Sequence, residues 1–340
     1  DYLMRNRVFT FWITDAKKDP DAAAKERAVV EKVFGASPPN VPVLGFWHSG
    51  PDAGINEYDG VGLAGEYGKI TVVSDWASNC SVLGGIKVDF APVVKAYQER
   101  TTMPAPTFDP SRIYIAFNVV ESGDAPSYLE TRQSNVWADP ARGSVPINWG
   151  FGLGAAELMP PVAEYYLETA TPNDRLFAAI SGAGYVHPFR SFMAGVNDPE
   201  AGWREYLRIT NALMDRLGFM ELGLYTDAWR RYDRTKMDPI MTRFADGVLA
   251  ATLLMPGMGR DGGMNPANGT YTIGQRNTMV AHILTRWPLS YASMTREERL
   301  DWLIKDIRDN TTPARPAFMQ VMALSWAYTP SDIAEIAKRL

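Results

Sequence analysis

The chain alternates between short apolar runs and longer amphipathic runs. Runs rich in Val, Ile, Phe and Tyr predict strands at about 7–13, 41–47, 69–75, 112–120, 145–149, 176–181, 221–226, 247–254 and 317–324. Helical periodicity predicts helices at about 20–34, 90–99, 155–168, 198–217, 231–244, 295–308 and 330–339. Strands that alternate with helices of this length form βα units, so the pattern predicts an α/β protein with a mostly parallel sheet.

Capping signals support three of these helices. Asp198 precedes Pro199, which places an N-cap before a proline in the first helical turn. Thr295 with Glu298 forms a capping box, and Thr329 opens the last helix in a similar way. The helical segments therefore have defined starting points.

The strands could close into a barrel or form an open, doubly wound sheet. No Gly-x-Gly-x-x-Gly follows the first predicted strand, and the sequence contains no Gly-Lys-Ser/Thr phosphate loop. We therefore expect a TIM-like (β/α) barrel of seven to eight mostly parallel strands, regular or irregular, with residues 1–340 as a single catalytic domain. The stretches 48–68, 121–146 and 256–278 are rich in Gly, Pro, Asn and Asp and predict long βα loops.

Composition narrows the function classes. The 340 residues are 46% hydrophobic, and 34 basic against 39 acidic residues give a net charge of −5. No block of Lys and Arg occurs, which argues against nucleic acid as the main partner, and no apolar run of about eighteen residues predicts a membrane span. Because the chain opens at Asp1 without a leader, we expect the mature form of a secreted, periplasmic or cell-surface protein, or an excised piece.

Cysteine and histidine are scarce. The single Cys80 excludes an internal disulfide, and His48, His187 and His282 lie far apart in sequence without metalloprotease spacing. A Cys- or His-rich zinc centre is therefore not expected. We predict no cofactor, although a Ca²⁺ or Mg²⁺ ion held by oxygen ligands stays open, as does the oligomeric state.

One turn stands out. The apolar run Leu176–Ile180 ends abruptly in the sequence Ser-Gly-Ala-Gly-Tyr-Val-His-Pro, residues 181–188, which we call the signature turn. Glycine at 182 and 184 allows positive φ or close backbone approach, and proline after His187 restricts that residue to extended geometry. The turn would hold Tyr185 and His187 in fixed directions at the end of a strand.

Carboxylates and aromatic rings recur at the predicted ends of the strands, where the active site of a parallel barrel lies. Besides Tyr185 and His187, these candidates are Asp75, Trp76, Glu121, Asp124, Trp149, Asp227 and Trp229. Sugar rings stack on aromatic faces, and glycosidic cleavage requires two carboxyl groups, one protonated and one ionised. Each residue also has an ordinary structural explanation, since strand-end tryptophans often pack in the core and acidic residues often cap helices.

The segment around the signature turn resembles a known family. Pro146-Ile-Asn-Trp149, Leu158-Met-Pro-Pro161, Thr169-Ala-Thr-Pro-Asn-Asp174 and the signature turn are similar to the bacterial family of proposed glycoside hydrolases named for its GxGYxYP motif. The similarity is specific over about 112–190. Here the second tyrosine of the motif is His187, and the acidic cluster after the fourth strand reads Glu121-Ser-Gly-Asp124. The resemblance implies a barrel-like catalytic domain and an activity on polysaccharides.

The sequence thus predicts an enzyme that hydrolyses a glycosidic bond. We expect the acid/base and its carboxylate partner among Glu121, Asp124 and Asp227, with Asp75 in reserve. Tyr185 and His187 would position the sugar, and Trp149, Trp229 and Trp76 would provide stacking faces, with Asp75 among the binding groups. Two alternatives stay open: metal-assisted hydrolysis of a sugar ester or amide, and a non-catalytic glycan-binding barrel.

Overall fold

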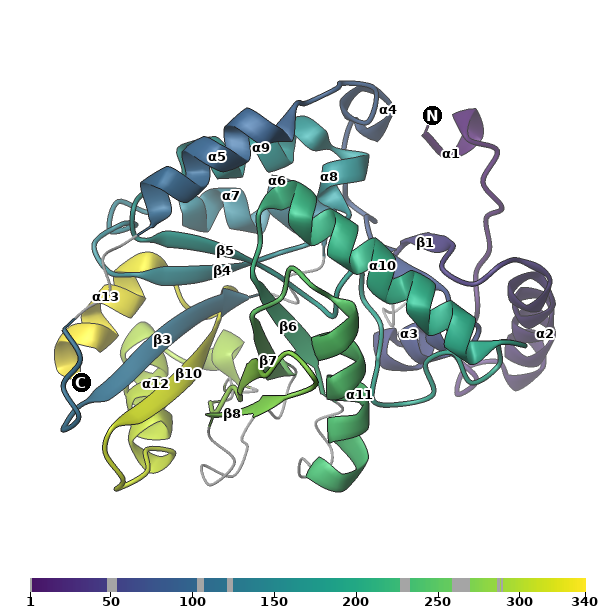
Figure 1. The fold of residues 1–340 in the computed structure, drawn as a ribbon. Coiled ribbons are helices and arrows are strands. Elements are labelled where there is room, and N and C mark those ends of the chain that lie inside the picture. Colours follow the sequence, from purple (N-terminus) through teal and green to yellow (C-terminus); the bar gives the residue numbers. More distant parts are fainter. Residues whose placement is uncertain are drawn as a thin grey trace.

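A computed structural model describes residues 2–47, 54–102, 107–120, 125–226, 233–258, 270–285, 288 and 290–340. The structure contains one large, mostly parallel sheet covered by helices and a smaller N-terminal part at its side (Figure 1). The α/β class and the predominance of parallel pairing agree with the prediction from the sequence.

The N-terminal part comprises the described residues between 2 and 102. Its two-stranded parallel sheet pairs β1 (Pro42–Gly45) with β2 (Ile70–Val73). Its helices are α1 (Tyr2–Arg5), α2 (Pro20–Ala36), α3 (Glu57–Glu66), α4 (Cys80–Leu83) and α5 (Phe90–Thr101). In Figure 1, α2, α3 and β1 lie beside the large sheet, whereas α5 lies over it with α9.

The large sheet has the order β10-β3-β4-β5-β6-β7-β9-β8. Its strands are β3 (Ile113–Val120), β4 (Ile147–Phe151), β5 (Asp174–Ala178), β6 (Glu221–Tyr225), β7 (Leu253–Met258), β8 (Thr270–Ile273), β9 (Thr278–Ala281) and β10 (Ala317–Leu324). All pairs are parallel except the β8–β9 hairpin.

Helices connect and cover these strands. They are α6 (Pro126–Glu130), α7 (Arg132–Trp137), α8 (Ala155–Leu158), α9 (Pro160–Thr169), α10 (Pro199–Leu217), α11 (Arg234–Gly247), α12 (Arg296–Asp309), α13 (Pro330–Arg339) and the 3₁₀ turn η2 (Tyr291–Ser293). In Figure 1, α5 and α9 lie together over β4 and β5, and α12 lies beside β3 and β10.

A closed barrel is not confirmed. Within the described ranges, the segment after β9 is joined to β10 by one isolated parallel bridge between Ile283 and Gln320. Hydrogen bonds from Leu284 N–H to the Gln320 carbonyl (3.0 Å) and from Met322 N–H to Thr285 Oγ1 (2.7 Å) accompany it. This contact is too short to count as a strand ladder. The prediction of one catalytic domain over the whole chain stays a prediction.

The two faces of the large sheet differ in polarity. In β4, the side chains of Trp149 and Phe151 face the helices, where they meet Trp137 of α7 and Tyr166 of α9. Asn148 directly precedes Trp149 in the strand, so its side chain points to the other face. There its amide donates to Asn118 Oδ1 (3.0 Å), and the Asn118 amide donates to Gln320 Oε1 (2.8 Å). A chain of hydrogen-bonded amides, buried at Asn118 and half-buried at Asn148 and Gln320, therefore crosses β4, β3 and β10.

Helix capping follows the sequence signals closely. Asp198 accepts a hydrogen bond from Ala201 N–H at the start of α10, and Gly218 ends that helix in the left-handed region (φ +69°). Capping boxes at Thr295 with Glu298 and at Thr329 with Asp332 open α12 and α13. These capping side chains define where the helices begin, because each accepts hydrogen bonds from backbone N–H groups that have no partner within the helix.

Other expectations were wrong. Residues 8–13 lie outside any strand, although Thr14 forms one bridge with Gly54. The three stretches interpreted as loops contain α3, α6, α7, β8 and part of β7 in their described residues, and the last ends at Thr278, where β9 begins. The strand expected at 247–254 begins at Leu253, because α11 runs on to Gly247. The abundance of Gly, Pro, Asn and Asp in these three stretches predicted loops, but parts of their backbones form helices and strands.

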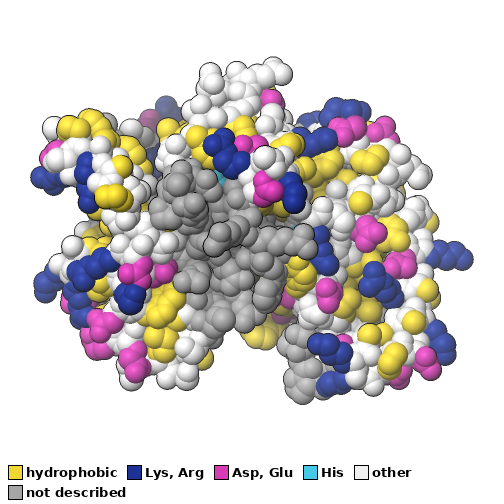
Figure 2. Space-filling model, turned by 90° about the horizontal axis from the view of Figure 1, so that it is seen from below, with side chains coloured by type: hydrophobic (Ala, Val, Ile, Leu, Met, Phe, Trp, Pro, Cys, Tyr) yellow, Lys and Arg dark blue, Asp and Glu magenta, His cyan; other side chains and the backbone are white. Residues whose placement is uncertain are grey.

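Charge is evenly distributed over the visible surface. In Figure 2, acidic and basic side chains are interspersed over the coloured part of the face seen from below, with hydrophobic side chains between them. Of the helices in the described residues, none is both long and apolar enough to cross a bilayer.

Candidate functional site

The signature turn joins the large sheet to the N-terminal part. It follows β5, and Tyr185 pairs antiparallel with Thr71 of β2, with Tyr185 N–H donating to the Thr71 carbonyl (2.8 Å). Gly184 lies against the same strand, where a Cβ atom would come within 2.6 Å of Ile70 Cγ2 and 2.8 Å of the Thr71 carbonyl oxygen. The second glycine of the motif is therefore required for close packing between the two parts.

The rest of the turn is tied to the large sheet. Gly182 has φ +124°, and a Cβ there would lie 2.7 Å from Thr210 Oγ1 of α10. Tyr206 of α10 donates its hydroxyl to the Ser181 carbonyl (3.1 Å), and Ser181 Oγ accepts a hydrogen bond from Tyr225 N–H (2.9 Å). The turn is thus held from both sides, which fixes the directions of Tyr185 and His187.

His187 lies within a column of stacked groups that we call the aromatic stack. Its ring is 4.7 Å from that of Tyr225, at the end of β6, and 4.9 Å from that of Tyr58 in α3. The Arg190 guanidinium lies over the Tyr58 ring, 4.4 Å from its centroid. The stack contains residues of both parts of the molecule, and His187 itself is buried.

Tyr185 connects the aromatic stack to a carboxylate, that of Glu57. Its ring packs edge-on against His187 (5.5 Å) and Tyr225 (5.6 Å), and its hydroxyl donates to Glu57 Oε1 (2.8 Å). Glu57 and Tyr58 are the first two residues of α3 and are half-buried. The cluster at the C-terminal ends of β5 and β6 thus combines a carboxylate, three aromatic groups and an imidazole.

The structure separates the predicted site residues into several groups. Tyr185 and His187 lie together, as the turn suggested. Asp75 and Trp76 follow β2 and are exposed, Trp76 at 73%; Asp75 Oδ1 accepts a weak hydrogen bond from Ser127 Oγ of α6 (3.4 Å). Four candidates, Glu121, Asp124, Asp227 and Trp229, lie outside the described residues, and so does His48.

Trp149 requires a correction. It is completely buried, its ring packs against Trp137 (5.0 Å), and its indole N–H donates to Asp174 Oδ1 (2.8 Å). Asp174 is the first residue of β5, at the end of the sheet opposite the signature turn. The prediction of a stacking face for sugar at Trp149 is wrong, because the ring faces the helices and has no exposed surface.

Sequence reasoning missed Glu57, Tyr58 and Tyr225. Tyr225 ends a strand that the sequence did predict, and it lies two residues before the candidate Asp227. Glu57 and Tyr58 lie in a stretch interpreted as a loop, although Asn56 followed by Asp59 is a helix-start signal: Asn56 Oδ1 accepts a hydrogen bond from Asp59 N–H (3.0 Å). Only the folded chain shows that this helix start faces the signature turn.

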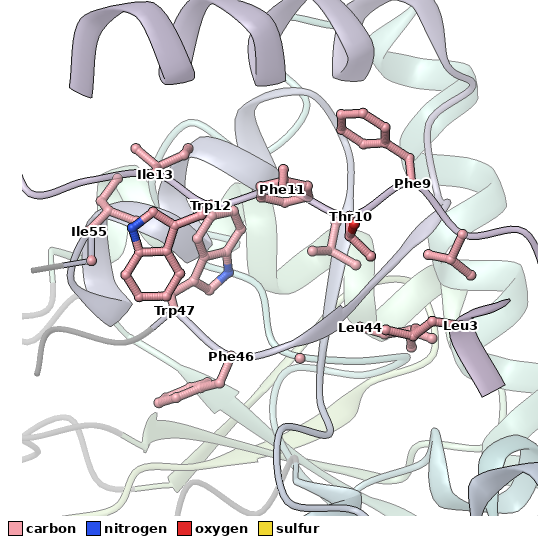
Figure 3. Close-up of a pocket in the computed structure, with 14 residues that line it drawn as sticks. Leu3, Phe9, Thr10, Phe11, Trp12, Ile13, Leu44, Phe46, Trp47 and Ile55 are labelled. Carbon is pink, nitrogen blue, oxygen red and sulfur yellow. The ribbon is translucent and has the colours of Figure 1, made fainter. Parts of the chain in front are cut away.

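A groove of about 230 Å³ lies on the N-terminal part and is lined in part by β1 (Figure 3). In Figure 3, Trp12 and Trp47 lie toward one end of the groove, and Leu3 and Leu44 lie toward the other. Trp47 donates its indole N–H to Thr71 Oγ1 (3.2 Å), so the groove adjoins the strand that pairs with Tyr185. No carboxylate occurs among its described lining residues, which suits apolar or stacking contacts rather than bond cleavage.

A second polar cluster lies between α11 and the β8–β9 hairpin. Tyr271 donates to Asp238 Oδ1 (3.0 Å), and its oxygen lies 3.4 Å from His282 Nε2. Arg234 is ion-paired with Asp238 (2.9 Å) and lies over the Tyr271 ring. Burial lowers the pKa of His282 to about 4, an effect that the Asp238 carboxylate opposes and the Arg234 guanidinium reinforces.

Within the described residues, no three His, Cys, Asp or Glu side chains are grouped closely enough to hold a metal ion. The carboxylates considered for a hard cation are Asp75, Glu121 and Asp124, and the last two lie outside the described residues.

Comparison with known proteins defines the class. Residues 111–340 match the family model described as "GxGYxYP putative glycoside hydrolase C-terminal domain", and residues 1–85 match the "GxGYxYP third domain". The chain therefore belongs to the GxGYxYP family, as the resemblance around the signature turn indicated. No curated protein matches the chain.

A solved structure shares the fold. The crystal structure of a putative hydrolase from Bacteroides thetaiotaomicron is similar over all of this chain and 60% of its own length, with a TM-score of 0.78 and 16% sequence identity. The chain thus spans about three fifths of that protein. At this identity the likeness shows the shared fold and does not transfer an activity.

Proposed function

We propose that the chain hydrolyses a glycosidic bond of a poly- or oligosaccharide with a carboxylate pair drawn from Glu121, Asp124 and Asp227. One observation carries the proposal: the cluster of Tyr185, His187, Tyr225 and Glu57 lies at the C-terminal ends of β5 and β6. Glu121 follows the last residue of β3 directly, and Asp227 comes two residues after the end of β6. The family's description as glycoside hydrolases supports the same reaction.

In this proposal one carboxyl group is protonated and donates its proton to the glycosidic oxygen. The second is ionised and either attacks the anomeric carbon or activates a water molecule, depending on whether the carboxyls lie about 5–5.5 Å or roughly 6.5–9.5 Å apart. Tyr185 and His187 position the sugar. The exposed Trp76 and, by sequence position, Trp229 supply stacking faces, and Asp75 binds sugar hydroxyls.

The proposed reaction needs no cofactor, so activity should survive exhaustive chelation. Loss of activity on chelation, restored by Ca²⁺ or Mg²⁺, would favour metal-assisted hydrolysis of a sugar ester or amide, with the ion held by Asp75, Glu121 and Asp124. A polysaccharide substrate is met outside the cytoplasm, and we therefore propose a secreted, periplasmic or cell-surface site of action.

The test is a kinetic comparison on a panel of 4-methylumbelliferyl glycosides and soluble polysaccharides. Glu121→Ala, Asp124→Ala and Asp227→Ala are assayed one at a time, with Asp21→Ala in the exposed first turn of α2 as the matched control. We expect at least two of the three to lower kcat by about 10²–10⁴-fold and the control to leave it unchanged. Wild-type activity in all three would contradict the assignment, and saturable glycan binding without product would favour a non-catalytic protein.

A further inference from the structure

Glu57 has a contact that helix formation does not explain. It is the first residue of α3, where an acidic side chain commonly interacts with the free N–H groups of the helix start. Here Asn56 provides the cap by accepting from Asp59 N–H (3.0 Å). The Glu57 carboxylate turns instead to the Tyr185 hydroxyl of the signature turn, 128 residues further along the chain (2.8 Å).

Tyr185 has little freedom to respond to a change at Glu57. Its backbone is paired with Thr71, and its ring is 3% exposed and packed between His187 and Tyr225. The ring position is therefore set by the joint between the two parts. What Glu57 determines is the direction of the phenolic O–H bond, because a carboxylate only accepts hydrogen bonds.

We infer that Glu57 is a positioning residue of the candidate site, contributed by the N-terminal part. This inference rests on the proposed glycosidase function. Since the single Tyr185 proton is directed to Glu57, the phenolic oxygen acts as an acceptor toward any substrate group. The matching ligand chemistry is a sugar hydroxyl that donates a hydrogen bond to the Tyr185 oxygen. Because Tyr185 in turn donates to the ionised Glu57 carboxylate, its hydrogen bond to Glu57 is charge-assisted and stronger than one between neutral groups.

The pairing is tested by a double-mutant cycle in kcat/KM on whichever 4-methylumbelliferyl glycoside the wild-type chain hydrolyses. Glu57→Gln, Tyr185→Phe and the double variant are compared, with near-ultraviolet circular dichroism and melting temperature recorded for each. We expect each single variant to lower kcat/KM by about 10–100-fold and the double variant to lie close to the more impaired single variant, because both remove the same interaction.

Two further variants separate positioning from folding. Glu57→Asp keeps the charge and should retain more activity than Glu57→Ala at similar melting temperature. Glu168→Gln is the matched control, since Glu168 is an exposed carboxylate in the last turn of α9, away from the signature turn; it should leave kcat/KM within about twofold of wild type.

Each outcome bears on a distinct statement. Glu57→Gln with wild-type kinetics, fully additive losses in the double variant, or a change in melting temperature alone would overturn the positioning role. If the Glu57 and Tyr185 variants lose activity together while Glu121, Asp124 and Asp227 variants retain it, the inference stands and the proposed carboxylate pair fails. A wild-type chain that hydrolyses no glycoside of the panel would overturn both.

Discussion

At the scale of single residues, the face of the sheet to which a side chain points decides which sequence candidates can act on a ligand. Trp149 and Trp76 both stand near predicted strand ends, yet Trp149 is completely buried and Trp76 is 73% exposed. The alternation of side chains along β4 put Trp149 on the helix-covered face, which the sequence could not show without knowing the register. Tyr185 and His187 could be predicted because glycines and a proline restricted the backbone around them.

His282 gives a prediction at the same scale. Its folded pKa of about 4 lies below the ordinary value of 6.5 because the ring is buried beside Asp238, Arg234 and Tyr271. Between these two pH values the unfolded chain binds a proton that the folded chain does not, so this residue makes stability fall as the pH drops from 6.5 toward 4 and adds no further loss below that.

The check is urea unfolding of wild type and His282→Gln at closely spaced pH values. Although carboxylates titrate in the same window, their contribution is common to both proteins and cancels in the difference. We expect the free-energy difference between wild type and variant to shift in favour of the variant by roughly 2–3 kcal/mol between pH 6.5 and pH 4. Parallel pH profiles would show that His282 does not titrate differently in the two states.

At the scale of elements, the signature turn is a joint as well as a candidate binding element. Its predicted role was to present Tyr185 and His187, and the structure adds its contacts with β2, α3 and α10. The sequence could not reveal the partner of the turn, because the contact of Gly184 with Ile70 and Thr71 spans more than one hundred residues. For the same reason α3 was missed as a contributor to the site.

The joint predicts a large difference between two glycine substitutions. Gly184→Ala would place a methyl group within 2.8 Å of a backbone oxygen of β2, so we expect destabilisation by about 1–3 kcal/mol. Gly35→Ala in α2 is the matched control, because its Cβ would meet Tyr67 at an ordinary 3.7 Å and alanine favours a helix interior. Thermal unfolding of both variants measures this difference, and equal melting temperatures would contradict the tight contact at Gly184.

At the scale of the whole molecule, the alternation of strands and helices predicted the fold class and, of the ten strands within the described residues, seven close to their observed positions. Parallel βα units leave a repeating pattern because each strand is buried on both faces and each helix on one. The β8–β9 hairpin and the small helices escaped prediction, since segments of four to six residues are too short to show a clear periodicity. Barrel closure depends on how the end strands meet, and that is not encoded in local periodicity.

The functional prediction divides in the same way. The choice of carbohydrate chemistry followed from carboxylates and aromatic rings at strand ends, and family membership agrees with it. The composition of the site depended on which distant segments meet, so Glu57, Tyr58 and Tyr225 emerged only from the fold. The central claim is that a sugar is held and cleaved where these segments meet the signature turn.

A crystal structure of the chain with the hydrolysis product of its best panel substrate tests this claim most directly. The account predicts sugar density at the C-terminal ends of β5 and β6, with a sugar hydroxyl within hydrogen-bond distance of Tyr185 or His187 and a carboxylate of Glu121, Asp124 or Asp227 near the anomeric carbon. Sugar bound elsewhere, with this cluster unoccupied, would contradict it.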